Sequence, residues 1–289
     1  MTKPRIAVLG LGIMGHGIAD NFVENGYDVT VWNRSPEKTR DLADKGAGVT
    51  DTPAKATQSA DIIFEVTAGD DSSRNVFCDE HDGIFSVATA EQTLITCATL
   101  TIAWTLELAA MCADKNITFF DMPMTGSRTG AESGNLTLLT GGDEDKLNEL
   151  RPTLEAIAGD VQYFGEAGNG MKFKLVLNAI QAAHVIAFGD AIRQANAVGL
   201  DTNATGELLG VKPGGVPTAQ ASNSFINPPE QTNFSVNWIL KDLKYAREML
   251  AETNFKAPIS PTILEHCIDV YQKAADAGLG DKDWTIVNA

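Results

Sequence analysis

The segment VLGLGIMGHG, positions 8–17, limits the possible folds of this chain more than any other stretch. Gly10, Gly12 and Gly15 fit the pattern G-x-G-x-x-G. A short apolar run at 5–9 precedes them, apolar residues at helical spacing follow, and a second apolar run occupies 28–32. Strand, glycine turn, helix and strand in this order are the setting in which such a loop binds a dinucleotide. A tight turn with a purely structural role is the alternative.

Each glycine has its own expected role in this loop. Gly10 permits the sharp turn out of the strand, and Gly12 lets backbone N–H groups and the helix N-terminus approach a pyrophosphate. Gly15 lets the helix lie close to the sheet, and Gly26 marks the expected end of that helix. The predicted cofactor-binding segment is Gly10, Leu11, Gly12, Ile13, Met14 and Gly15.

Beyond this unit the chain continues as alternating strands and helices and then changes character. Further apolar runs at 60–66, 93–99, 117–123 and 134–142 read as strands. After about residue 165, Ala, Leu, Val and Ile recur at helical spacing. The sequence therefore predicts an α/β fold: an N-terminal Rossmann dinucleotide-binding domain over 1–165, then an all-α domain over 166–289 entered through one long helix.

The bulk properties exclude several classes of protein. A net charge of −16 and a pI near 4.6 argue against nucleic acid or an anionic membrane as a partner, because both require a basic surface. There is no run of 18 apolar residues, and the first residues lead directly into a strand instead of a signal peptide. The cysteines show no metal-ligand spacing, so we expect no metal site and free thiols in the cytoplasm.

The end of the second strand favours NADP over NAD. NAD-binding proteins place an acid there for the ribose hydroxyls, but this chain has Asn33 followed by Arg34. A guanidinium suits a 2′-phosphate, and Ser35 and Lys38 can add a hydroxyl and a second charge. These four residues are therefore predicted cofactor contacts. They also fit an ordinary helix start, with Ser35 as N-cap and Pro36 in the first turn.

Two later segments carry candidate chemistry. Thr125, Gly126 and Ser127 follow a strand in a turn rich in hydroxyl and N–H groups, which can hold a small carboxylate or can be only a polar loop. Lys174 and Asn178 stand one helical turn apart in an otherwise apolar stretch. Burying these two polar groups is unfavourable without a purpose, although both side chains can also extend to solvent.

Four motifs in the same order carry a resemblance to a known family, and it spans nearly the whole chain. They are Gly10–Gly15; Asp121-Met122-Pro123-Met124-Thr125-Gly126, with Thr125 in place of Ser; Gly168, Gly170, Lys174 and Asn178 in G-x-G-x-x-x-K-x-x-x-N; and Lys241-Asp242-Leu243. The chain resembles the β-hydroxyacid dehydrogenase family, which includes 3-hydroxyisobutyrate dehydrogenases, tartronate semialdehyde reductases and glyoxylate/succinic semialdehyde reductases. The pattern is most similar to the last of these branches.

The resemblance implies an NADPH-dependent enzyme that interconverts a small carboxylate-bearing aldehyde and its hydroxy acid. Lys174 would be the general acid and base. The implied substrate-binding residues are Thr125, Gly126, Ser127, Asn178 and Lys241; Lys241 would close the site and touch the cofactor, and Asp242 would orient it. Relatives form oligomers, so we expect a homodimer or homotetramer.

The loops after the runs at 60–66 and 93–99 would face the cofactor, which makes Val66, Thr67 and Thr99 candidate contacts. Here the chain departs from the family, which often has Met-Leu-Pro at Val66-Thr67-Ala68 and Ser-Thr at Ala98-Thr99. Two other functions stay open. An imine reductase shares the architecture but usually lacks the lysine, and a non-catalytic NADPH-binding protein would not need the pair Lys174 and Asn178.

Overall fold

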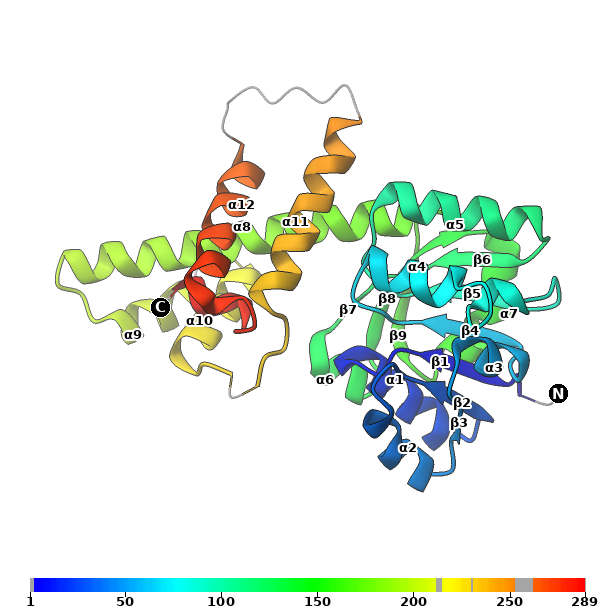
Figure 1. Ribbon diagram of the computed structural model, residues 1–289. Coiled ribbons are helices and arrows are strands. Elements are labelled where there is room, and N and C mark those ends of the chain that lie inside the picture. The colour runs from blue at the N-terminus through cyan, green and yellow to red at the C-terminus, as the bar shows by residue number, and fades with distance from the viewer. Residues whose placement is uncertain (1–2, 212–214, 230, 253–261, 289) are drawn as a thin grey trace. The chain divides into compact units, whose positions relative to one another are not determined.

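The first part of the chain is an α/β unit. The computed structural model describes residues 3–211, 215–229, 231–252 and 262–288, and Figure 1 shows its elements. The strands are β1 (Ile6–Leu9), β2 (Val29–Trp32), β3 (Gly48–Val49), β4 (Ile62–Glu65), β5 (Thr93–Thr96), β6 (Thr118–Asp121), β7 (Met124–Thr125), β8 (Leu136–Gly142) and β9 (Ala158–Tyr163). The helices of this part are α1 (Ile13–Glu24), α2 (Arg40–Asp44), α3 (Pro53–Gln58), α4 (Asp70–Cys78), α5 (Ile102–Asp114), α6 (Ser127–Glu132) and α7 (Glu144–Leu154).

The strands form one sheet whose order reverses at β1. The order is β3-β2-β1-β4-β5-β6-β8-β7, and β9 pairs with β8. From β3 to β6 all neighbours are parallel, whereas β8 runs antiparallel to β6 and to β7. In such a sheet the ligand site lies beyond the carboxyl ends of the strands at the point of reversal. This is the place where the glycine loop leaves β1.

The central strands β1 and β4 are apolar except for Glu65 at the end of β4, because helices cover both faces of the sheet. All four residues of β1 and of β4 are buried. Ile18 and Phe22 of α1 pack with Val8 and Phe64 in the main core. This burial fixes α1, and therefore the glycine loop before it, against the middle of the sheet.

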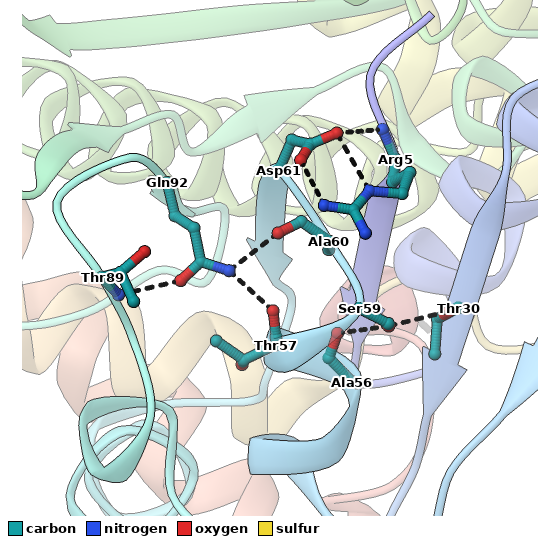
Figure 2. Close-up of polar contacts among 9 residues, drawn as sticks. All are labelled: Arg5, Thr30, Ala56, Thr57, Ser59, Ala60, Asp61, Thr89 and Gln92. Atoms are coloured by element: carbon teal, nitrogen blue, oxygen red, sulfur yellow. Dashed lines mark hydrogen bonds and ion pairs between the residues drawn. The ribbon is translucent and has the colours of Figure 1, made fainter.

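Polar contacts close the edge of the sheet at which the parallel strands begin (Figure 2). The Gln92 amide group, just before β5, donates to the carbonyl oxygens of Thr57 and Ala60 at 2.7 Å each. Arg5, just before β1, pairs with Asp61, just before β4, at 2.7 Å. These contacts connect the residues just before β1, β4 and β5. They stabilise the amino-terminal ends of these strands, whereas the glycine loop lies at the opposite, carboxyl ends.

The predicted α/β class is confirmed, and the differences are local. The apolar run at 117–123 contains β6 and ends in a turn at Met122 and Pro123; the short strand β7 follows that turn and was not predicted. β3 and β9 were not predicted, since β3 has only two residues and β9 lacks an apolar run. Helix α1 ends at Glu24, and Gly26 follows with a φ of +72°, as the sequence predicts.

The rest of the chain is helical. Its elements are α8 (Asn169–Ala197), α9 (Thr202–Val211), α10 (Gly215–Ile226), α11 (Val236–Ala251), α12 (Ile263–Ala274), and the single turns Ala275–Leu279 and Trp284–Asn288. The chain divides into two compact units, Met1–Lys174 and Leu175–Ala289, so that the division falls inside α8. The sequence places it at 165/166. Leu240, Leu243, Tyr271 and Trp284 belong to the core of the second unit.

Helix α8 is also long and apolar enough, by composition, to cross a membrane. It is the one such helix among the described residues. This is weak evidence, because the core helix of a soluble protein meets the same criterion.

Candidate active site

The glycine loop has the backbone that the sequence predicts. Gly10 has a φ of +104°, and a Cβ there would lie 2.5 Å from the carbonyl oxygen of Val66. A Cβ on Gly15 would lie 1.9 Å from the carbonyl oxygen of Gly10. Gly12 is the N-cap of α1. Apart from its chain neighbours, no described atom lies within 4 Å of the position that a Cβ on Gly12 would take. Two glycines are thus required by packing, whereas the third leaves an open space at a helix N-terminus that fits a pyrophosphate.

Asn33, after β2, holds this loop. Its Oδ1 accepts a hydrogen bond from the N–H of Leu11 at 2.8 Å, and its Nδ2 donates to the carbonyl oxygen of Ser35 at 3.0 Å. The side chain therefore links the loop to the turn that bears Arg34. Asn33 is well placed as a support for the loop, a role that the sequence did not reveal.

Arg34 and Lys38 extend into solvent beside this turn, and within the described part of the chain neither forms an ion pair. Ser35 is the N-cap, as the sequence predicts, although its hydroxyl makes no capping hydrogen bond. Pro36 does open a helix, but it is one 3-10 turn, Pro36–Thr39, in which Lys38 bonds to the Ser35 carbonyl and not to its hydroxyl. The Ser35 hydroxyl is not used as a cap.

A buried acid stands at the end of β4, next to the predicted cofactor contacts Val66 and Thr67. Glu65 is fully buried; it accepts hydrogen bonds from the Thr96 hydroxyl at 2.5 Å and the Thr67 N–H at 3.1 Å. Burial raises the pKa of this carboxyl above its usual value, and the hydrogen bonds oppose the increase. The sequence analysis missed Glu65. The available signal was the acid that follows the apolar residues Ile62, Ile63 and Phe64 in the run ADIIFEV.

The predicted carboxylate turn lies between β7 and α6. Gly126 has a φ of +130°, and Ser127, which follows it, has a φ of +56°. Thr125 is half-buried, whereas Gly126 and Ser127 are exposed. Helix α6 packs directly on α1, because a Cβ on Gly17 would lie 2.6 Å from the carbonyl oxygen of Ala131. The turn and the glycine loop therefore belong to two helices in contact.

Lys174 belongs to the same compact unit and stands in the second turn of α8. Its side chain is half-buried. Lys172 is exposed and donates to Asn169 at 2.9 Å, so that the two lysines lie in different environments. Thr99 is partly buried in the loop after β5.

The second unit holds the other two predicted substrate residues. Asn178, 2% exposed, donates its amide to Oδ2 of Asp242 at 2.6 Å. Lys241 pairs with Oδ1 of Asp242 at 2.8 Å and lies over the ring of Tyr245. Asp242 does contact Lys241, as expected, but it also binds Asn178, which the sequence did not show. Asn178 is buried, so its extension to solvent is excluded.

No metal-binding cluster of three or more His, Cys, Asp or Glu side chains occurs among the described residues. Cys97, Cys112 and Cys267 are buried free thiols, and Cys78 is an exposed one. The candidate site residues in the first unit offer backbone N–H groups, hydroxyls and basic side chains.

This loop at the point where the sheet reverses, followed by a helical unit, defines an NAD(P)-dependent oxidoreductase, and the comparisons with known proteins agree. Residues 5–165 match the NAD-binding domain of 6-phosphogluconate dehydrogenase, and residues 168–288 match the NAD-binding region of NADP-dependent 3-hydroxyisobutyrate dehydrogenase. The chain belongs to the β-hydroxyacid dehydrogenase family. It is an oxidoreductase that acts on a CH–OH group.

Among its relatives is glyoxylate/succinic semialdehyde reductase 2, chloroplastic, of Arabidopsis thaliana, at 30% identity over 98% of this chain and 78% of that protein. The structure of Mycobacterium tuberculosis 3-hydroxyisobutyrate dehydrogenase with L-serine has a TM-score of 0.83 at 28% identity, with 100% of this chain and 98% of that one covered. Psf3 in complex with NADP+ and 2-OPP has a TM-score of 0.89 at 22% identity, over 98% of both chains, and shows the same fold.

Proposed function

We propose that this enzyme reduces a small aldehyde that bears a carboxylate, glyoxylate or a semialdehyde, to its hydroxy acid with NADPH, and catalyses the reverse reaction. One observation carries the proposal. Half-buried Lys174 belongs to the same compact unit as the glycine loop. The names of the Arabidopsis and Mycobacterium relatives support the substrate class.

NADPH, when bound, supplies the hydride. The ammonium of Lys174 stabilises the negative charge that develops on the carbonyl oxygen and donates a proton to it. In the oxidative direction the neutral amine accepts the proton of the hydroxyl. The hydroxyls of Thr125 and Ser127 and the free N–H groups of their turn bind the carboxylate. The family resemblance adds Asn178 and Lys241 as further candidate substrate contacts.

The preference for NADPH rests on the turn after β2. No carboxylate stands at Asn33 to repel a 2′-phosphate, and Arg34 and Lys38 have no ion-pair partner among the described residues. A guanidinium can bind a phosphate through two parallel hydrogen bonds. Ser35 adds a hydroxyl. This turn therefore selects the phosphorylated cofactor.

We also expect a cytoplasmic homodimer or homotetramer. Val176 and Ile180 of α8 are 55% and 53% exposed, which is unusual for large apolar side chains one turn apart. A second copy of the chain would remove them from water. Sedimentation at micromolar concentration measures the assembly, and a monomer would refute it.

The decisive experiment is a panel of substrates. Oxidation of NADPH and of NADH is followed at 340 nm, roughly the absorption band of the reduced nicotinamide, with glyoxylate, succinic semialdehyde, tartronate semialdehyde and a cyclic imine. The proposal expects turnover of at least one of the aldehydes, with NADPH preferred. Turnover of the imine alone would identify an imine reductase. Binding of NADPH without turnover of any of the four would indicate a protein that only binds the cofactor.

A further inference from the structure

A buried carboxylate holds the start of the helix that carries Lys174. Asp121, the last residue of β6, has no exposed surface. Its Oδ1 accepts a hydrogen bond from the N–H of Gly168 at 2.6 Å, and its Oδ2 accepts one from the N–H of Met171 at 2.7 Å. N–H groups at the start of a helix have no carbonyl partner within the helix. One side chain from the sheet therefore binds the N–H of Gly168, immediately before α8, and the N–H of Met171 in its first turn.

The packing around this contact leaves no room for displacement. A Cβ on Gly141 of β8 would lie 2.5 Å from Oδ1 of Asp121, and a Cβ on Gly170 would lie 2.1 Å from the carbonyl oxygen of Leu139. Gly168 has a φ of +91°, a conformation that residues with side chains rarely adopt. The two glycines of the G-x-G motif before Lys174 thus serve the close docking of α8 on the sheet.

A second contact ties the same helical turn to the loop that bears Thr99. The N–H of Leu100 points at Sδ of Met171 at 3.3 Å, and both residues are fully buried. The first turn of α8 is therefore held by β6, by β8 and by the loop after β5. All of these belong to the unit that also contains the glycine loop.

We propose that Asp121 is a positioning residue, which fixes the first turn of α8 through Gly168 and Met171 and thereby sets the place of Lys174 for proton transfer. Lys174 follows Met171 by three residues, less than one helical turn. The part that concerns proton transfer rests on the proposed function. Asp121 itself takes no part in the chemistry.

A carboxylate suits this task better than an amide. Both N–H groups need an acceptor, and an ionised carboxylate provides two, whereas an amide would turn an NH₂ group toward one of the donors. The bonds to Gly168 and Met171 are short, as charge-assisted bonds are. Asp121→Asn therefore keeps the size of the side chain and removes one of the two contacts.

Protonation of Asp121 weakens the same contact, because a protonated oxygen is a poorer acceptor. Burial raises the pKa of this carboxyl to about 7, although the two N–H groups and the charge of Lys172 oppose the increase. The titratable groups facing it are Lys172 on α8 and Glu65, which lies beyond Thr96 in the same row of the sheet. The positioning of Lys174 is therefore strongest above neutral pH.

The test compares Asp121→Asn with Asp143→Asn in the full-length chain. Asp143 caps α7 through the N–H of Lys146 at 2.8 Å and contacts no predicted site residue, so it controls for the loss of a capping charge. Hydrogen exchange of the peptide that covers residues 166–176, measured without substrate, reports the contact itself. kcat, KM for the aldehyde and Kd for NADPH, each measured across pH 6–9 around the pKa of about 7, report positioning.

We expect faster exchange in this peptide for Asp121→Asn only, and a kcat reduced by about 10–100-fold with an unchanged Kd for NADPH. The fall in wild-type kcat on the acid side of pH 7 should also disappear. Unchanged exchange would overturn the contact, and this result does not depend on the proposed function. Faster exchange with wild-type kcat, or an equal loss in Asp143→Asn, would overturn positioning while leaving the proposed function intact.

Discussion

In the helical unit Asn178 donates its amide to Asp242 across 2.6 Å, and both side chains are at least 98% buried. The other oxygen of the same carboxylate faces the ammonium of Lys241 at 2.8 Å. One buried acid therefore sets the orientation of two residues that lie 63 positions apart in the sequence. Asp242 therefore organises the polar side chains in this part of the helical unit.

Asp242→Ala should destabilise the protein by about 3–5 kcal/mol, because it leaves a buried amide and a partly buried ammonium without their acceptor. Urea denaturation followed by circular dichroism measures the effect. Asp269→Ala removes an exposed partner of Lys273 in the same unit and should change stability little. Equal stability of the two variants would show that the buried contact contributes nothing.

Two alanine substitutions in the glycine loop should separate the effect on protein stability from the effect on NADPH binding. Gly12→Ala adds a methyl group where no described atom lies within 4 Å, so stability should be unchanged while Kd for NADPH rises. Gly15→Ala places that methyl 1.9 Å from the Gly10 carbonyl oxygen and should lower stability by about 1–3 kcal/mol. Thermal unfolding and NADPH fluorescence titration give both quantities. Unaltered affinity in Gly12→Ala would mean that the open space is not used by the cofactor.

Arg34→Ala should weaken NADPH binding by about 1.5–3 kcal/mol and affect NADH much less, because it removes a charge-assisted hydrogen bond to the phosphate. Asn33→Asp should act in the same direction, since it introduces a negative charge and removes the donor to the Ser35 carbonyl. Arg5→Ala removes the same charge at the opposite edge of the sheet and serves as the control. Parallel losses for NADPH and NADH would contradict the assignment of Arg34.

Lys174→Ala should reduce kcat by about 10²–10⁴-fold, the usual contribution of a general acid, with little change in NADPH affinity. Arginine at this position keeps the charge but does not release its proton at neutral pH, so Lys174→Arg should not restore turnover. Lys146→Ala, on the exposed face of α7, is the matched control. Steady-state kinetics with the best aldehyde substrate measures kcat for each variant. Near-normal turnover by Lys174→Ala would mean that another residue is the general acid.

Stability should depend on pH through Asp121. Its pKa is 3.8 in a model peptide and about 7 in the native state, so between these values the native state holds a proton that the unfolded state has lost. Stability from this group is therefore full at low pH and falls as pH rises toward 7, by up to about 4 kcal/mol. Urea denaturation should show wild type losing stability relative to Asp121→Asn between about pH 4 and 7. A constant difference would exclude this titration.

Much of the α/β unit is readable from the sequence because its signals are local. An apolar run, three glycines and helical spacing define β1, the loop and α1 without any distant contact. The strand β9 gives a weaker signal, since its residues Ala158–Tyr163 include no continuous apolar run, and it pairs with β8 alone. The N-cap at Ser35 and the first position of Pro36 were predicted, but the 3-10 form of that turn was not. Residue type alone does not distinguish a 3-10 turn from an α-helix.

The supporting groups of the site could not be predicted in the same way. Asp121 and Asp242 lie in recognisable motifs, but their partners are 47 and 64 residues away and are chosen by the folded chain. In the sequence, Glu65 is one acid at the end of an apolar strand, and only the folded structure shows that the Thr96 hydroxyl donates a hydrogen bond to it. The sequence thus names candidate reacting groups more readily than the groups that hold them.

At Ser127 the requirements of protein stability and of the proposed substrate binding oppose each other. It shares a φ of +56° with Asn116, but asparagine tolerates this left-handed conformation whereas serine is disfavoured in it. Glycine at 127 would relieve that strain and would delete the hydroxyl proposed to bind the carboxylate. Selection of variants for heat resistance alone would therefore favour glycine here, and selection for turnover would favour serine. A library randomised at this position and sorted by each criterion would separate into two different populations.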